Sequence, residues 1–315
     1  MIPIDLITGF LGAGKTTFLI KYARYFMSKG LRVGILEYDC GAVNIDMMLL
    51  NSLRGPKCEL EMVDASCGID CLQRRFRTKL ISMAMSGYDR VIVEPSGVFD
   101  MDIFFDTVRD EPLDKWYEIG NVITVVNPMI EKDLPKEADY ILASQAASAG
   151  CVVFSRTQLC KPEDVEYAKT YLSEKASEIK CKAFDPVYLS KDFDELEDSD
   201  LCKLASCGYH IASYEKMTAG NTSDFSAVSF LEIPEDVDDL KALINDIFAD
   251  EECGHIMRIK GFVHSEGRSL EINATRNEIT FIERATGPNS LIIIGNGINR
   301  ERIEKKNGEY FRRKH

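Results

Sequence analysis

Gly9-Phe10-Leu11-Gly12-Ala13-Gly14-Lys15-Thr16 is the stretch that decides the fold of this chain. It matches the pattern G-x-x-x-x-G-K-[ST], in which a glycine-rich loop cradles phosphate groups. An apolar run at 4–8 precedes it, and apolar residues at helical spacing follow it over 16–26. A buried strand, the loop and a helix in this order are the context that the pattern requires. The stretch therefore predicts a phosphate-binding loop at the first strand-to-helix turn.

The residue types in this loop each suit a nucleoside triphosphate. Gly12, Ala13 and Gly14 are predicted to point backbone N–H groups at the phosphates, at the positive end of the following helix. Lys15 is predicted to reach the β- and γ-phosphate oxygens, and the Thr16 hydroxyl is predicted to ligate Mg²⁺. We therefore expect a nucleotide with its magnesium ion at this end of the molecule.

A second motif supplies a carboxylate for the same ion. The apolar run Val91-Ile92-Val93 leads into Glu94-Pro95-Ser96-Gly97. Glu94 is predicted to hold Mg²⁺ through a water molecule, and the Gly97 N–H is predicted to face the γ-phosphate. Movement of this loop would then report hydrolysis. Taken alone, the same residues also fit an ordinary turn at the end of a strand.

Apolar runs and helical patterns alternate along the first part of the chain. Runs typical of buried strands are separated by stretches long enough for helices, and they lie at 31–38, 58–63, 88–94, 121–126, 151–155 and 187–189. This alternation predicts an α/β fold with a parallel sheet covered by helices on both faces.

The rhythm changes after the polar stretch 218–224. One helical pattern at 235–248 is accompanied by strand patterns at 225–233, 257–264, 269–274, 278–283 and 290–294. This order predicts a smaller C-terminal α+β domain with a largely antiparallel sheet. The predicted domains are 1–217 and 225–315, and we expect the charged tail 301–315 to fray at its end.

Composition excludes several classes of function. The 315 residues include 38 Lys+Arg against 51 Asp+Glu, a net charge of -13 without a basic block, which argues against a nucleic-acid partner. No run approaches the ~18 apolar residues of a membrane span, and the start lacks a basic n-region, so we expect a cytoplasmic protein with no membrane partner. Ten cysteines in a chain of this size do not predict a disulfide framework.

Four segments in order resemble the CobW-like GTPases, relatives of the nickel-insertion GTPases of urease and hydrogenase maturation. They are Gly9 to Thr17, Glu94 to Gly97, Met257 to Phe262 and Leu291 to Gly295. The resemblance covers both predicted domains. It implies a P-loop NTPase fold, Mg²⁺-dependent GTP binding that includes Thr17, and slow GTP hydrolysis. It also implies a metal chaperone or insertase, with a metalloprotein or corrinoid-protein client and a link to cobalamin. A homodimer is a further expectation.

The chain departs from the family pattern at its thiols. Where the family carries Gly-Cys-x-Cys-Cys, this chain has Cys67-Gly-Ile-Asp-Cys71. Two thiolates, with Asp70 and with Cys40 as a further ligand, suit a borderline or soft ion such as Zn²⁺ or Co²⁺. Two alternatives stay open: inert packing, which is the common fate of a free thiol, and a dithiol that cycles to a disulfide.

A second departure concerns the nucleotide base. The family usually reads guanine with Asn-Lys-x-Asp, and this chain has Ser155-Arg156-Thr157-Gln158. Arg156 is able to stack on a base. The Gln158 amide has both an acceptor and donors, so it fits guanine or adenine. The resemblance favours GTP, and ATP stays open.

Asp39 completes the set of predicted catalytic residues, with Lys15 and Glu94. The resemblance places Glu37 to Asp46 in the switch that senses γ-phosphate, with Asp39 approaching Mg²⁺ or an activating water. The plain alternative is a strand end and a polar turn. The alternative function is a nucleotide-dependent protein-binding switch without metal cargo, which uses ATP if Gln158 admits adenine.

Overall fold

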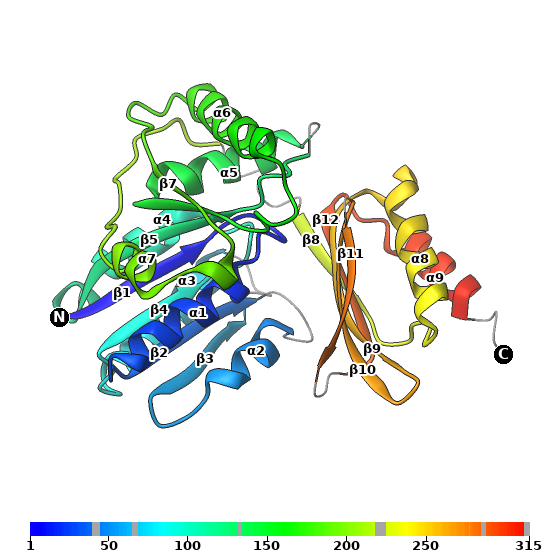
Figure 1. Cartoon of the computed structure of the whole chain (residues 1–315), viewed down its shortest axis with the longest axis horizontal. Helices are drawn as coiled ribbons and strands as arrows, with labels where there is room; N and C mark the ends of the chain where they lie inside the picture. Colours follow the sequence, from blue (N-terminus) through cyan, green and yellow to red (C-terminus); the bar gives the residue numbers. More distant parts are fainter. Residues whose placement is uncertain are drawn as a thin grey trace. The chain divides into compact units, whose positions relative to one another are not determined.

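The computed structural model describes residues 1–39, 45–64, 69–131, 134–217, 225–276, 278–284 and 288–311 (Figure 1). The contacts between residues divide the chain into two compact units. The N-terminal unit holds residues 1–39 and 49–218, and the C-terminal unit holds residues 40–48 and 219–315. The predicted bounds 1–217 and 225–315 treat each domain as one uninterrupted stretch, so they do not anticipate that 40–48 joins the C-terminal unit.

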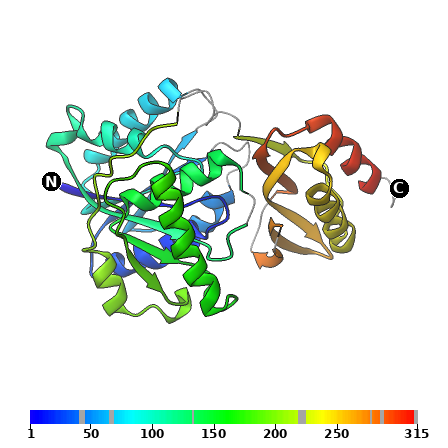
Figure 2. The ribbon, with the colours of Figure 1, turned by 90° about the horizontal axis from the view of Figure 1, so that it is seen from above.

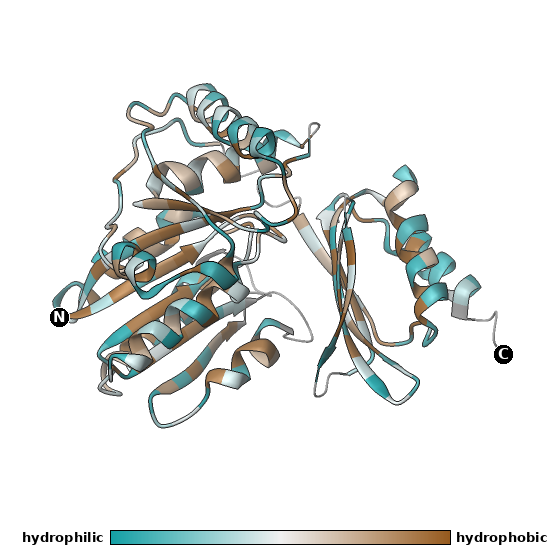
Figure 3. Ribbon diagram, in the orientation of Figure 1, coloured by the Kyte–Doolittle hydropathy of each residue, from teal (hydrophilic) through white to brown (hydrophobic). Residues whose placement is uncertain are grey.

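Seven parallel strands form the sheet of the N-terminal unit, in the order β3-β2-β4-β1-β5-β6-β7. Most residues of its central strands are buried, because helices cover both faces, and Figure 3 shows these strands as mostly hydrophobic. The predicted parallel sheet is confirmed. The strands are β1 (Ile2–Thr8), β2 (Val33–Asp39), β3 (Cys58–Asp64), β4 (Arg90–Glu94), β5 (Tyr117–Val126), β6 (Cys151–Phe154) and β7 (Val187–Ser190).

Helices lie on both faces of this sheet, as Figure 2 shows. One face is covered by α3 and α4, whose Phe76, Leu80 and Phe104 pack with Val91 and Val93 of β4 in one buried cluster. The helices between the strands are α1 (Lys15–Ser28), α2 (Ile45–Leu50), α3 (Ile69–Ala84), α4 (Met101–Arg109), α5 (Lys136–Ser148), α6 (Pro162–Glu178) and α7 (Asp198–Leu204). None of the helices in the described part of the chain is long and apolar enough to span a membrane.

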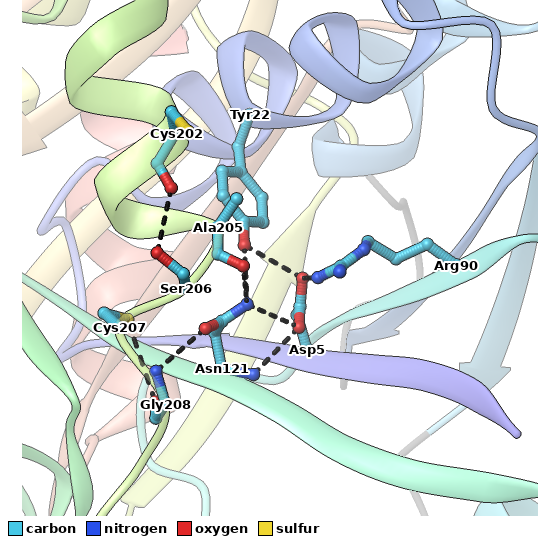
Figure 4. A network of polar contacts seen from close by, with 9 residues as sticks. All are labelled: Asp5, Tyr22, Arg90, Asn121, Cys202, Ala205, Ser206, Cys207 and Gly208. Atoms are coloured by element: carbon cyan, nitrogen blue, oxygen red, sulfur yellow. Dashed lines mark hydrogen bonds and ion pairs between the residues drawn. The ribbon is translucent and has the colours of Figure 1, made fainter.

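A buried polar network joins β1, α1, β4 and β5 (Figure 4). The Asp5 carboxylate, fully buried, accepts hydrogen bonds from the Tyr22 hydroxyl at 2.9 Å, from Arg90 at 2.5 Å and from the Asn121 backbone N–H at 2.9 Å. Burial raises the pKa of Asp5, and the Arg90 charge opposes that rise. The Asn121 side chain extends the network to the Ala205 carbonyl and the Gly208 N–H, so the turn after α7 is held against the sheet.

The C-terminal unit carries a five-stranded antiparallel sheet in the order β11-β10-β9-β12-β8. Alternate residues of the strands pack with α8 (Val237–Ala249) and α9 (Arg300–Phe311) in one core that includes Ile259, Val263, Leu243 and Ile303. The predicted α+β domain with its antiparallel sheet is confirmed. The strands are β8 (Phe225–Phe230), β9 (His255–Ser265), β10 (Arg268–Thr275), β11 (Glu278–Arg284) and β12 (Ser290–Asn296).

The charged C-terminal segment contains a helix that sequence analysis did not predict. Residues 300–311 form α9, and the end of the tail, where we expected fraying, lies outside the described residues. Ile303 is fully buried and Tyr310 is nearly so, and the Tyr310 hydroxyl donates to Asp246 of α8. Ile303 and Tyr310 are seven positions apart and so lie on one face of the helix, which they anchor although most of its other positions are polar.

Candidate nucleotide site and neighbouring thiols

The predicted phosphate loop connects β1 to α1. Gly9, Gly12 and Gly14 have φ angles of 143°, 75° and 93°, in the region that favours glycine. A Cβ on Gly9 would lie 2.1 Å from the Val125 carbonyl oxygen, so the loop also depends on a close approach to β5. Ala13 is buried and its N–H donates to the Phe10 carbonyl at 3.2 Å. The loop thus has the backbone geometry that the sequence pattern predicts.

Lys15 and Thr16 begin α1 and are both buried. The Lys15 Nζ donates to the Gly9 carbonyl at 3.0 Å, so its ammonium group folds back over the loop. The Thr16 hydroxyl donates to Glu94 Oε1 at 2.7 Å. Glu94 ends β4 and is 3% exposed. The structure therefore brings together the lysine, the hydroxyl and the carboxylate that the sequence assigned to phosphate and Mg²⁺. Thr17 follows on α1 and is exposed.

Glu37 is a second buried carboxylate, which the resemblance placed in the switch segment without a role of its own. It is 2% exposed and its Cα pairs in register with that of Glu94 on the neighbouring strand β4. Residues in register on adjacent strands present their side chains to the same face. Glu37 and Glu94 therefore place two buried carboxylates side by side on these strands. Together with the Thr16 hydroxyl, they offer the oxygen ligands that Mg²⁺ prefers, so the residues fit the ion.

The loop after β4 lies against the phosphate loop. A Cβ on Gly97 would meet the Leu11 backbone nitrogen at 2.6 Å, so only glycine fits there. The Gly97 carbonyl accepts a hydrogen bond from Gln145 Nε2 at 3.3 Å, and Gln145 is fully buried in α5. Sequence reasoning missed Gln145, because no motif marks α5.

Ser155, predicted for the base, also lies next to the phosphate loop. A Cβ on Gly14 would be 3.5 Å from the Ser155 Cβ and 3.8 Å from the Phe193 ring. Ser155 is buried and follows β6, while Arg156 has a left-handed φ of 53° and Gln158 is exposed. Phe193, which follows β7, is a neighbour that sequence reasoning missed, because it belongs to no motif.

The thiol site is only partly within the described residues. Asp39 ends β2, with its Cα in register with Asp64, and its side chain lies outside the description. Cys40 and Cys67 also lie outside the described residues. Cys71 is half-buried in the first turn of α3, and Asp70 immediately precedes it. Within the described ranges, no three His, Cys, Asp or Glu side chains are grouped closely enough to hold a metal ion.

Other cysteines have environments that suppress thiolate formation. Burial raises the pKa of Cys58 and of Cys151 to about 11 and that of Cys207 to about 12. The thiolate is the form that binds metal and reacts. These three thiols therefore behave as packing groups near neutral pH, and Cys58 is a poor additional ligand.

Comparison with protein families identifies both parts of the chain. Residues 3–182 match the nucleotide-binding domain of the CobW/HypB/UreG family. The chain belongs to this family. Residues 229–306 match the C-terminal domain of the cobalamin synthesis protein cobW. The resemblance inferred from the four sequence segments is thus confirmed, and with it a nucleotide-binding domain.

Curated relatives are similar at low identity. The zinc chaperone YjiA of Escherichia coli K12 is 23% identical over 284 residues, which are 84% of this chain and 83% of that protein. The zinc-regulated GTPase metalloprotein activator 1 of Schizosaccharomyces pombe is 24% identical over 168 residues, 51% of this chain but only 40% of that protein.

Two solved structures of related proteins align with this chain to different extents. The Zn(II)-bound YjiA GTPase from E. coli aligns over 98% of both chains at 18% identity with a TM-score of 0.37. The hydrogenase maturation factor HypB of Archaeoglobus fulgidus aligns over 61% of this chain and 82% of its own at 15% identity with a TM-score of 0.40.

Proposed function

We propose that this protein is a Mg²⁺-dependent GTP-binding protein and GTPase that delivers a transition metal, Zn²⁺ or Co²⁺, to a metalloprotein client. The observation that carries the nucleotide part is the cluster of Lys15, Thr16, Glu94 and Glu37 at the end of the phosphate loop. The cargo and the client are supported by relatives whose names are zinc chaperone and zinc-regulated GTPase metalloprotein activator.

The side chains of the site divide the work of binding. Lys15, which donates to the Gly9 carbonyl, would bind β- and γ-phosphate oxygens, and Thr16, which donates to Glu94, would hold Mg²⁺ through its hydroxyl oxygen. Glu94 and Glu37 would supply negative charge to hold the hydrated ion. Mg²⁺, when bound, neutralises charge on the phosphates.

The loop after β4 and the end of β2 complete the hydrolytic site in this proposal. The Gly97 N–H faces the γ-phosphate, and Gln145 fixes the orientation of that backbone by holding the Gly97 carbonyl. Asp39 orients the attacking water. Hydrolysis by the protein alone is slow, because a stimulating group from a partner is worth about 10³-fold or more in related reactions.

GTP is the proposed nucleotide, by family membership. Ser155 and Arg156 border the base, and Arg156 stacks on it through its guanidinium plane. The Gln158 amide accepts a hydrogen bond from the base edge or donates one to it. Because it does both, it discriminates weakly between guanine and adenine. Binding of both nucleotides with similar affinity would replace GTP by a nucleoside triphosphate of either base.

Cys67 and Cys71, with Cys40 as a third thiol, are the proposed cargo ligands. Cys71 lies in the first turn of the helix that follows β3, and Asp39 ends the adjacent parallel strand β2, so both residues belong to the same edge of the sheet. Thiolates suit Zn²⁺ and Co²⁺. The proposal includes a corrinoid protein as one kind of client and a homodimer as the assembly.

Calorimetry with non-hydrolysable GTP and ATP analogues at fixed Mg²⁺ tests the nucleotide site. We expect Lys15→Ala to weaken GTP-analogue binding at least tenfold and to abolish measurable hydrolysis. Lys29→Ala is the matched control, because Lys29 follows the same helix but pairs with exposed Asp198. Hydrolysis that is unchanged in Lys15→Ala would contradict the proposed mechanism.

Metal analysis of the purified protein tests the cargo. We expect about one equivalent of Zn²⁺ or Co²⁺ on the wild type and its loss in Cys67→Ser/Cys71→Ser. Cys58→Ser/Cys207→Ser is the control pair, because burial keeps both thiols protonated. Full metal retention by the first variant would exclude Cys67 and Cys71 as ligands and would favour a nucleotide-dependent switch without metal cargo.

A further inference from the structure

Lys260 is a buried cation on the sheet of the C-terminal unit. It lies in β9 between Ile292 of β12 and Asn273 of β10, and only 3% of its surface is exposed. Its Nζ donates to Asp46 Oδ2 at 2.9 Å. Asp46 belongs to α2 and precedes Lys260 by 214 positions in the sequence. A buried ammonium group therefore binds a carboxylate from the segment that follows β2.

A second contact holds the same segment on the same sheet. Met48, two residues after Asp46, packs against buried Phe262 and Ile292. Phe262 is two residues after Lys260 on β9, so the ion pair and the apolar contact use one face of the strand. This face is opposite to the one that Ile259 and Val263 present to α8 and α9. We call Asp46, Met48 and Lys260 the latch.

The latch is connected to the nucleotide site through the chain itself. Strand β2 ends at Asp39, two residues after Glu37, which is in register with Glu94. Asp46 follows seven positions later, a length of at most about 25 Å when fully extended. A displacement at the end of β2 therefore acts on the latch through a short tether. Removal of either charge of a buried pair is costly, so the segment does not leave the sheet easily.

We propose that the latch transmits the nucleotide state of the site to the C-terminal sheet, with Lys260 as the positioning residue that holds the segment after β2. This inference rests on the proposed nucleotide function. In this proposal, a γ-phosphate that orders the end of β2 displaces Asp46 and Met48. Their contacts with Lys260 and Phe262 then change the local stability of the C-terminal sheet. Segments that respond to γ-phosphate are a common element of such switches, and their response is useful only if another part of the molecule receives it.

Hydrogen exchange on the full chain measures this transmission. The wild type is compared without nucleotide, with Mg²⁺ and GDP, and with Mg²⁺ and a non-hydrolysable GTP analogue. We expect exchange of the amides in 255–265 and 290–296 to differ at least fivefold between the two nucleotides, the lower end of ordinary allosteric coupling. In Lys260→Met we expect that difference to disappear, while calorimetry shows analogue binding within threefold of the wild type.

Lys306→Met is the matched control. Lys306 pairs with Asp250 at 2.9 Å within the same unit and is also largely buried, but it lies on α9. A purely structural role for Lys260 predicts that both variants lose stability and that both keep the nucleotide response. The latch predicts that Lys306→Met keeps it and Lys260→Met does not. If Lys260→Met fails to fold, Asp46→Asn breaks the same pair from its more exposed partner and carries the same expectation.

Two failures are distinguishable. A wild type that binds neither nucleotide in calorimetry would overturn the proposed function and the latch with it. A wild type that binds the analogue but shows equal exchange over 255–265 in both nucleotide states would overturn the latch alone. Persistence of the full difference in a folded Lys260→Met or Asp46→Asn variant would do the same.

Discussion

At the scale of single residues, the phosphate loop shows how far a local pattern reaches. Gly9, Gly14 and Lys15 were assigned from the sequence because the loop needs positive φ angles and a cation within one turn, and both requirements are met by neighbouring residues. Gln145 was not assigned, and Glu37 was placed only within the predicted switch segment. Their proximity to Glu94 and Gly97 depends on strand register and on helix packing, which no local pattern encodes.

Gly9→Ala tests the close approach in this loop. The added Cβ would lie 2.1 Å from the Val125 carbonyl oxygen, and the φ of 143° is itself unfavourable for alanine. We expect the free energy of unfolding to fall by more than about 2 kcal/mol. Gly30→Ala is the control, because its φ is 91° but nothing lies within 4 Å of the added Cβ, so a loss of about 1 kcal/mol is expected. Urea titrations compare them, and equal losses would refute a role for the contact with β5.

At the scale of elements, apolar periodicity located the strands because burial on both faces leaves a clear signal, as in Val91 to Val93. It failed where few apolar residues anchor an element. Helix α9 is seated by Ile303 and Tyr310 among charged neighbours, and α7 lies where no periodic pattern was recognised. In both cases the partner surface lies far away in sequence, so the tertiary contact decides whether the helix forms.

The network around Asp5 makes four elements depend on one ion pair. Arg90→Met would leave the fully buried Asp5 carboxylate without its cation, so we expect a loss of about 3–5 kcal/mol at neutral pH. Burial already raises the pKa of Asp5, and loss of Arg90 raises it further. A carboxyl group with a raised folded-state pKa contributes most below its unfolded value of 3.8, and stability falls as pH rises through the folded pKa. The loss should therefore be smaller at pH 4 than at pH 7.

Denaturant titrations at several pH values measure this dependence. The control is Lys115→Met, which removes an exposed pair with Glu111 and should cost less than about 1 kcal/mol at every pH. A destabilisation by Arg90→Met that does not change between pH 4 and pH 7 would show that the Asp5 charge is not what the arginine stabilises.

At the scale of the whole molecule, sequence analysis predicted both domains. It did not predict that a short segment from within the N-terminal part of the chain belongs to the C-terminal unit. Asp46 and Met48 follow a strand of the first sheet in the sequence, and their contacts are with the sheet of the second unit. A single sequence shows where patterns change, as near 218, and contains no signal for a short segment that packs on a distant sheet. Asp46 is polar and Met48 apolar, and both are unremarkable until Lys260 and Phe262 are placed beside them.

The contact of Asp46 with Lys260 predicts that bound nucleotide raises the free energy of unfolding of both units. A ligand at 100 times its Kd stabilises the state that binds it by about 2.7 kcal/mol. If the units were independent, only the unit that holds the phosphate loop would gain this stability. Trp116 is the one tryptophan and lies in the N-terminal unit, so its fluorescence reports that unit, whereas far-UV circular dichroism reports both. With a bound GTP analogue, we expect the two signals to change together in the wild type because the latch shares the gain. In Asp46→Asn we expect the fluorescence transition to lie at higher denaturant than the dichroism transition, because the dichroism then includes a C-terminal unit that unfolds earlier. Coincident transitions in the variant would mean that the stability is shared by some route other than Lys260 and Asp46.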